Sequence, residues 1–313
     1  MRRSLIQLRG RHGHTPTRVR EFRFLPYVIV LLALTAGGER SIAQDQASFS
    51  SNTSANGVTD PCSDPSVHPA IKEAFHLVCA KERPPMANRV NQQVIVIGFV
   101  GGFVRRNDVK HPEVLFANYL RSRYGPMVHA AVFGNRETKQ ALEFIHESMG
   151  TNKDGSQASS EHKTVKIILY GHSWGASQVL EFAGELEREK IPVSLTIQVD
   201  SVRKRGQNDR SVPANVERAV NFYQRKGLTP GRPLIVAANA DQTKILGNFH
   251  MTYKHEDIRC DNYRWLSRVL NKPHHQIEND PYVWDQIVTL IDSELSSQNR
   301  VEAVQSASHT SEY

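Results

Sequence analysis

Short apolar runs alternate with amphipathic segments along most of the chain. The runs are six or seven residues long and mostly rich in valine, isoleucine and leucine, which is typical of strands buried on both faces. The segments between them place apolar residues three and four positions apart, which predicts helices. This alternation indicates a doubly wound, mostly parallel sheet with helices on both faces, an α/β fold. The predicted strands are 93–98, 127–133, 165–170, 193–199 and 233–238, and the predicted helices are 68–80, 114–123, 139–149, 176–190, 216–223 and 283–295.

The junction between strand 165–170 and helix 176–190 reads Gly-His-Ser-Trp-Gly, with Ser173 at its centre. A G-x-S-x-G pattern between a buried strand and a helix is typical of a nucleophile elbow, a strained turn that exposes a reactive serine. The two glycines are needed there because a side chain would collide with the neighbouring strand and helix. Ser173 is therefore the candidate nucleophile, and a plain glycine–serine turn is the alternative interpretation.

A glycine-rich loop follows strand 93–98, in the order Phe99-Val100-Gly101-Gly102. Backbone N–H groups of such a loop can point into a cleft and hold the oxyanion that forms during acyl transfer. Two N–H groups are required. One is expected from Trp174, directly after the serine, and the other from Phe99 or Val100. A simple glycine turn is the structural alternative.

A serine hydroxyl needs a base within hydrogen-bond reach and an acid that orients the base. In folds with this elbow, the acid and then the base follow the serine along the chain. Asp200, which directly ends strand 193–199, is the favoured acid because strand ends deliver side chains to the carboxyl edge of a sheet. Asp241, a few residues beyond strand 233–238, is the alternative acid.

The base is expected just ahead of the last helix, where His274 and His275 are adjacent. We favour His274 as the base and keep His275 as the alternative, while His250 and His255 are interpreted as loop or pocket-lining residues. The spacing of these histidines and Cys260 matches no familiar metal-ligand pattern, so no metal and no cofactor are expected.

These residues resemble the α/β-hydrolase superfamily, specifically lipase- or esterase-like serine hydrolases. The resemblance rests on QVIVIGFVGG, LYGHSWGAS, LTIQVDSV, VPANVERAVNFYQ and HHQIENDPYVW, which together span residues 93 to 284. It implies an α/β-hydrolase fold with Ser173 as nucleophile, Asp200 as acid and His274 as base. The VDSV stretch is similar to the Asp-Pro-Val strand end of some lipase-like relatives, although serine replaces the proline. The oxyanion loop departs from the family pattern because the usual His-Gly is absent.

The first 43 residues change how the composition is interpreted. The chain carries a formal charge of +7, but this segment holds eight arginines and two acids, so residues 44–313 carry only +1. Basicity of the whole chain therefore gives no reason to expect nucleic acid binding. The segment has an arginine-rich start, a short apolar stretch and small residues before a cleavage point, which is typical of a signal peptide. It predicts an exported protein, periplasmic or secreted, or one anchored in a membrane by this segment alone.

The predicted organisation is a signal peptide at 1–43, a flexible linker at 44–60, one α/β-hydrolase domain at 61–295 and a disordered tail at 296–313. In an exported protein, Cys62 and Cys79 are the natural disulfide pair, with Cys260 left over. The expected activity is hydrolysis of a small-molecule or lipid ester through an acyl-enzyme. A catalytically inactive binding protein of the cell envelope and an acyltransferase with the same triad are the alternatives. The pattern does not determine the oligomeric state.

Overall fold

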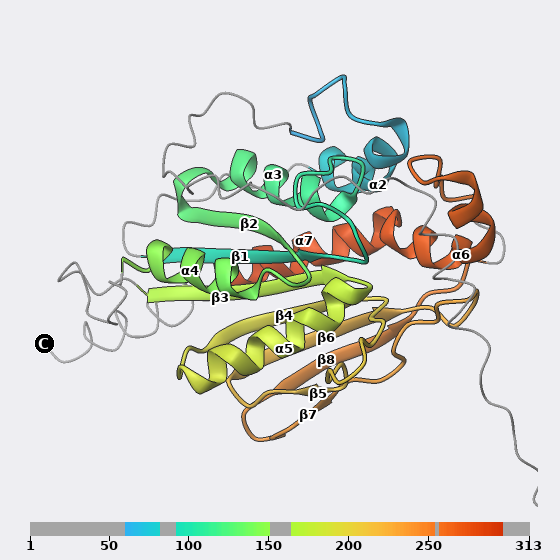
Figure 1. Ribbon diagram of the computed structural model, residues 1–313. Helices are drawn as coiled ribbons and strands as arrows, with labels where there is room; N and C mark the ends of the chain where they lie inside the picture. Colours follow the sequence, from blue (N-terminus) through green and yellow to red (C-terminus); the bar gives the residue numbers. More distant parts are fainter. Residues whose placement is uncertain (1–59, 82–91, 151–163, 254–256, 297–313) are drawn as a thin grey trace, which may run out of the picture. The chain divides into compact units, whose positions relative to one another are not determined.

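Six parallel strands form the central sheet of this computed structural model (Figure 1). The structure describes residues 60–81, 92–150, 164–253 and 257–296; the predicted signal segment, linker residues 44–59 and tail residues 297–313 lie outside them. Every neighbouring pair of strands is parallel, so their carboxyl ends share one edge. The strands, in their order across the sheet, are β2 (Val128–Gly134), β1 (Gln92–Val100), β3 (Thr164–His172), β4 (Val193–Val199), β6 (Val216–Tyr223) and β8 (Lys244–His250).

Helices connect and cover these strands. The predicted helices at 68–80, 114–123, 139–149, 176–190 and 283–295 are confirmed, with bounds that shift by at most two residues. None of the helices in the parts of the chain listed above is long and apolar enough to cross a membrane. The helices are α2 (Pro69–Ala80), α3 (Pro112–Tyr124), α4 (Thr138–Ser148), α5 (Trp174–Arg188), α6 (Trp265–Glu278) and α7 (Pro281–Ser296), with a short 3-10 helix, η1 (Gly125–Met127).

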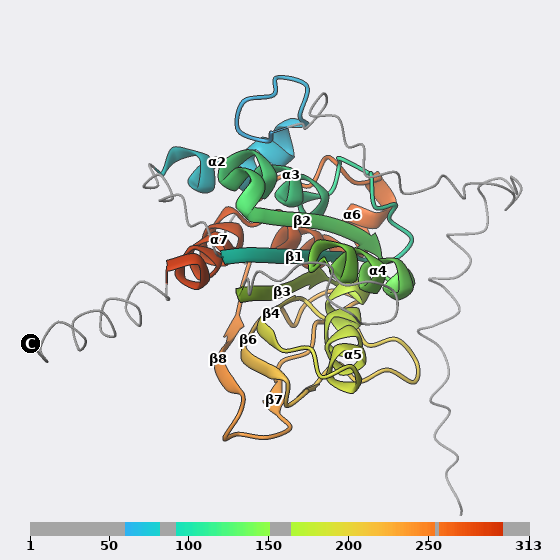
Figure 2. The ribbon, with the colours of Figure 1, turned by 90° about the vertical axis from the view of Figure 1, so that its left-hand side faces the viewer.

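The sheet separates two apolar cores. Successive residues of β1 point to opposite faces, so Val94 and Val96 join the core under α2, α3 and α7, whereas Ile95 and Ile97 join the core under α4 and α5. Figure 2 shows α7 and α5 on opposite sides of the strands. Burial of both faces explains why β4 is buried at each of its seven positions. The predicted α/β architecture with helices on both faces is thus confirmed.

Two predicted elements beyond β4 are wrong. Residues 216–223 are the inner strand β6 and not a helix, because Val216 and Ala219 pack into one core while Val220 and Phe222 pack into the other. Their apolar spacing fits a helix equally well, and pairing between β4 and β8 decides the outcome.

The predicted strand 233–238 is also shorter than expected. Only Val236–Ala237 (β7) forms a strand, and it pairs with β5 (Ser211–Val212) in a separate two-stranded sheet. The last strand of the main sheet is β8, which the apolar pattern does not reveal because this edge strand is only partly buried and contains Gly247.

The N-terminal segment is joined to α2 by a disulfide bond between Cys62 and Cys79, as predicted. Cys260, the third cysteine, is free and buried. Burial raises the pKa of its thiol to about 12, which disfavours the reactive thiolate.

The Cys62–Cys79 bond closes a loop with a sequence separation of 17 residues. Replacing both cysteines with alanine should lower the free energy of unfolding by about 3 kcal/mol, because the open chain gains entropy when unfolded. Urea denaturation measures the change. The wild-type protein in reductant should match the double variant, and an unchanged midpoint in both would contradict a stabilising role.

Candidate active site

Ser173 lies in the tight turn between β3 and α5, with φ 57° and ψ −122°. This left-handed backbone is uncommon for a residue with a side chain. The turn requires the flanking glycines: a Cβ on Gly171 would lie 2.6 Å from the Gly175 backbone, and a Cβ on Gly175 would overlap the carbonyl oxygen of Phe99. The chain therefore crosses directly over β1, and the Ser173 side chain stands at the carboxyl edge of the sheet.

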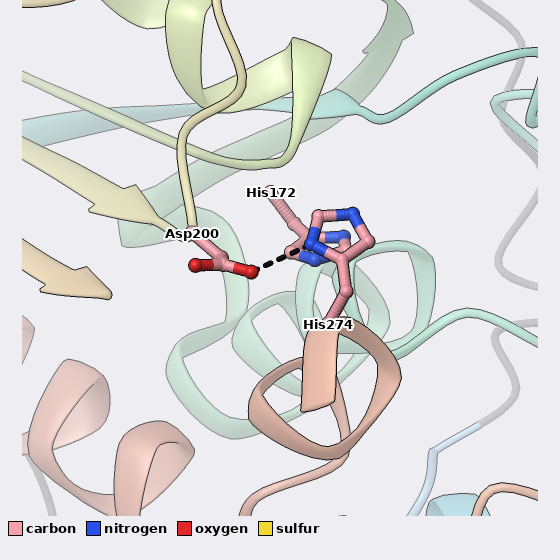
Figure 3. A group of neighbouring side chains, drawn as sticks. All are labelled: His172, Asp200 and His274. Carbon is pink, nitrogen blue, oxygen red and sulfur yellow. Dashed lines mark hydrogen bonds and ion pairs between the residues drawn. The ribbon is translucent and has the colours of Figure 1, made fainter. Parts of the chain in front are cut away.

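Three predicted residues meet at this edge. Ser173 Oγ lies 3.0 Å from His274 Nε2, and His274 Nδ1 lies 2.6 Å from Asp200 Oδ2. A carboxylate accepts hydrogen bonds only, so Nδ1 carries the proton that is donated to Asp200, and Nε2 is left to accept the Ser173 hydroxyl proton. Figure 3 shows Asp200 and His274 facing each other across this bond.

Asp200 is held rigidly at the end of β4. It is fully buried and has a positive φ of 47°. Gln224 donates twice to its carboxylate, from the backbone N–H to Oδ1 at 3.0 Å and from the side-chain amide to Oδ2 at 2.8 Å. Gly231 provides the space, because a Cβ there would overlap Asp200 Oδ1. The Asp200 carboxylate is thus fixed by Gln224 and Gly231, residues after β6 to which the sequence pattern assigned no role.

His274 was expected on a loop before the last helix. It lies instead within the helix α6. Asn271 has non-helical backbone angles and Pro273 lies inside the helix, so α6 is two helical segments joined at a kink. The kink starts a new turn directly before His274 and directs its ring toward Ser173 and Asp200.

The glycine loop borders the serine at Gly101, just beyond Phe99 and Val100, the two residues expected to supply the second N–H. Phe99 lies inside β1, opposite Phe133 and Gly171 in the parallel ladder, and its ring is in the core. A Cβ on Gly101, in contrast, would lie 2.9 Å from Ser173 Cβ and 3.6 Å from Ser173 Oγ. The Gly101–Gly102 backbone is therefore the part of this loop that borders the hydroxyl.

The alternative acid and base lie elsewhere. Asp241 is exposed in the turn between β7 and β8, where its backbone N–H donates to Asn239. His275 Nε2 is 2.7 Å from Ser267 Oγ, and its ring stacks on Tyr263 at 3.9 Å. His250 stacks on Tyr223, and His255 lies outside the described residues.

A buried charged cluster lies directly behind His274. The ring of His172 packs against that of His274, with centroids 4.5 Å apart (Figure 3). His172 Nδ1 lies 3.1 Å from Glu278 and 3.4 Å from Glu113, and His111 Nδ1 lies 2.8 Å from Glu278. The sequence pattern gave no reason to group these residues, since they come from three separate segments.

Burial favours the neutral forms of the histidines and glutamates in this cluster, whereas the attraction between their opposite charges favours the charged forms. Burial lowers the pKa of both histidines, but nearby carboxyl groups, chiefly Glu278 with Glu113, together outweigh it and raise the pKa of His172 well above its ordinary value and that of His111 to about 9. The two histidines in turn hold the pKa of the Glu278 carboxyl well below its usual range, against burial. Burial and the nearby Glu278 raise the pKa of Glu113. Glu278 therefore carries the negative charge that stabilises both imidazolium rings.

Two groups of side chains at this edge are close enough together for a metal ion, His172 with Asp200 and His274, and His111 with Glu113 and Glu278. Their shortest contacts, 2.6 and 2.8 Å, are hydrogen-bond distances between an imidazole and a carboxylate. Hydrogen bonding accounts for these contacts, so the geometry gives no independent support for a metal.

No protein-family model matches this chain, and comparison with curated proteins finds no match. Similarity therefore does not establish a family. The function must be inferred from the chain's own fold and site.

The His111–Glu278 pair should make stability depend on pH. Its contribution is fully present below the unfolded pKa of His111, about 6.5, and is lost as the pH rises through about 9. A His111→Gln variant should be less stable than the wild type by about 3 kcal/mol at pH 6, with most of the difference gone by pH 10. Urea denaturation at a series of pH values tests this.

Glu278→Gln serves as the matched background for that measurement. Without the carboxylate, the His111→Gln change should lose most of its pH dependence, because the imidazolium has lost its partner. A pH-dependent difference that persists unchanged in this background would contradict the assignment to Glu278.

Proposed function

We propose that this chain is a serine hydrolase of the α/β-hydrolase fold that cleaves an ester bond through an acyl-enzyme. The observation that carries the proposal is the continuous hydrogen-bonded chain from Ser173 through His274 to Asp200. Its three members come from the ends of β3 and β4 and from the kinked helix after β8. Their order along the chain, nucleophile then acid then base, is the order that α/β hydrolases use.

In the first step, His274 Nε2 takes the proton of the Ser173 hydroxyl while Oγ attacks the ester carbonyl carbon. The carbonyl π electrons move to the oxygen, which becomes an oxyanion. Asp200 keeps the imidazole in the tautomer with Nδ1–H and stabilises the imidazolium. Its burial and its two bonds from Gln224 support this role, because they keep the carboxylate in place during the step.

The oxyanion needs N–H donors that are already aimed at it. Trp174 is the first residue of α5, so its N–H has no carbonyl one turn earlier in the helix to bond with. We assign it one donor position. The second donor is assigned to the Gly101–Gly102 backbone and not to Phe99, because Gly101 borders the Ser173 hydroxyl.

Collapse of the tetrahedral intermediate expels the alcohol, which receives the proton from His274 Nε2. A water molecule then attacks the acyl carbon, with His274 again acting as base, and returns the free acid and Ser173. His172 acts as a positioning residue in this cycle: its ring packs against His274, and its bonds to Glu278 and Glu113 hold it there.

The disulfide supports a second part of the proposal, export from the cytoplasm. A bond between Cys62 and Cys79 forms and persists in oxidising compartments, such as the periplasm or the exterior of the cell. Export is also what the arginine-rich, apolar start of the chain predicts.

Ser173→Ala should lower the turnover of a p-nitrophenyl ester by about 10⁴-fold or more, because the hydroxyl that forms the acyl-enzyme is removed. A series of esters with different acyl lengths measured on the wild type supplies the best substrate. Thermal unfolding of the variant serves as the folding control. Turnover by a folded Ser173→Ala variant at the wild-type rate would overturn the proposal.

The neighbouring alternatives provide matched controls for the other two members. His274→Asn and Asp200→Asn should each lower kcat by about 10³-fold or more, since the serine loses its base or the base loses its orientation. His275→Asn and Asp241→Asn should retain kcat to within about tenfold. The reverse ranking in either pair would show that the wrong residue has been assigned.

A further inference from the structure

Four loop and helix segments surround the candidate site at the carboxyl edge of the sheet. Three of them, residues 101–111, 200–207 and 224–232, directly follow the ends of β1, β4 and β6, and the fourth, residues 264–273, is the first part of α6 with the residue before it. Three of the four contact one another: Arg232 N–H donates to Ser201 O, and Thr229 Oγ1 donates to Asn271 Oδ1 at 3.1 Å. We call their combined surface the catalytic face.

The catalytic face concentrates positive charge. Its 38 residues contain twelve lysines and arginines and two aspartates, Asp108 and the buried Asp200, a formal charge of +10. Residues 44–313 together carry only +1, so the rest of that stretch carries −9. The near-neutral total conceals a strong separation of charge.

Most of these basic side chains reach solvent. The exposed ones include Arg105 and Arg106 after β1, Arg225 and Lys226 after β6, Arg264 directly before α6 and Lys272 on it. Arg232 is engaged with the buried Asp209, and the amine of Lys204 donates to Asn135 and Gln178. The exposed lysines and arginines of the four segments form what we call the basic rim.

The same face also exposes apolar side chains. Of the ten large apolar residues that are exposed in the described part of the chain, seven lie in these four segments. Trp265 and Val269 are 67% and 69% exposed and lie four residues apart on α6, as do the exposed Leu266 and Leu270, so they share one side of the helix. Arg264, the residue before the helix, and Arg268 are likewise four residues apart and lie next to that side.

Two more exposed apolar side chains lie beside α6 and beside the residue that follows Ser173. Gly227 packs against Pro273 and the Leu270 carbonyl, which places the neighbouring Leu228, 57% exposed, beside α6. On the other side of the site, the exposed ring of Phe103 packs edge-on against Trp174, the residue after Ser173. Exposed apolar residues that gather within a polar border mark an interaction surface.

We propose that the catalytic face docks on an anionic lipid surface. The tryptophan and aliphatic side chains of α6 enter the headgroup region, and the basic rim contacts the lipid phosphates. Charge complementarity selects this occupant: a second copy of the chain would bring two faces of +10 together, and an uncharged apolar partner would leave the rim unused. The docking places the site at the lipid surface, beyond the membrane contact expected from the N-terminal segment alone.

Tryptophan fluorescence can test the docking at the proposed surface itself. The chain has three tryptophans, Trp174, Trp265 and Trp284, and none lies in the first 59 residues. Emission is measured with vesicles that carry brominated acyl chains, which quench only a tryptophan in contact with them. Vesicles of phosphatidylcholine alone are compared with vesicles that also contain phosphatidylglycerol. The Ser173→Ala protein is used throughout so that no lipid is consumed.

The vesicles with phosphatidylglycerol should quench the emission, those of phosphatidylcholine alone should not, and added salt should weaken the effect. Trp265→Phe should remove most of the quenching. Arg105→Glu with Arg106→Glu should require at least about tenfold more lipid for half-quenching. Arg188→Glu with Lys244→Glu makes the same change of charge at the end of α5 and the start of β8, away from the catalytic face. This control should need the same lipid concentration for half-quenching as the Ser173→Ala protein.

Equal quenching by both lipids, no quenching by either, or full quenching in Trp265→Phe would overturn the proposal. An equal rise in the lipid concentration needed for half-quenching in the two charge-reversal variants would also overturn it. Binding of a single-stranded oligonucleotide without binding of vesicles would assign the basic rim to a nucleic acid instead. If the Ser173→Ala protein binds the vesicles but the wild type hydrolyses no ester, the lipid-docking proposal is supported and the hydrolase proposal is contradicted. The two proposals can therefore fail separately.

Discussion

The close crossing of α5 over β1 determines the rest of the site. Ser173 keeps a left-handed backbone because the chain must turn sharply from β3 into α5, with Gly175 against the Phe99 carbonyl and Gly171 against the Gly175 backbone. Two cores on opposite faces of the sheet hold these elements together. The strain at Ser173 is thus maintained by packing over the whole domain, and it puts the hydroxyl at the carboxyl edge where the neighbouring strands end.

The partners of Ser173 are fixed by buried polar contacts rather than by the loops alone. Asp200 is fully buried between Gln224 and Gly231, and the kink in α6 orients His274. Behind His274, the charged His172 and Glu278 form a second layer that restricts where the imidazole can lie. An arrangement of this kind can move a proton repeatedly without rearranging, which general base catalysis requires.

The residues that could be predicted from the sequence are those with a local signature. The elbow has a fixed pattern between a strand and a helix, and Asp200 directly ends a continuous apolar run. The second layer had no such signature, because His111, Glu113 and Glu278 come together only where the start of α3 and the end of α6 meet around His172. The helix predicted at 216–223 was wrong because apolar spacing alone does not distinguish a helix from an inner strand. The charge of the catalytic face was likewise hidden, since its four segments are far apart along the chain.

The central claim is that Ser173 is a nucleophile activated by His274, and covalent labelling tests it most directly. After reaction with a fluorophosphonate, mass spectrometry of the digested wild type should find one adduct, on the peptide that contains Ser173. The adduct should be absent from Ser173→Ala and should form far more slowly on His274→Asn. A folded wild-type protein that remains unlabelled, or an adduct that forms equally fast without His274, would contradict the account.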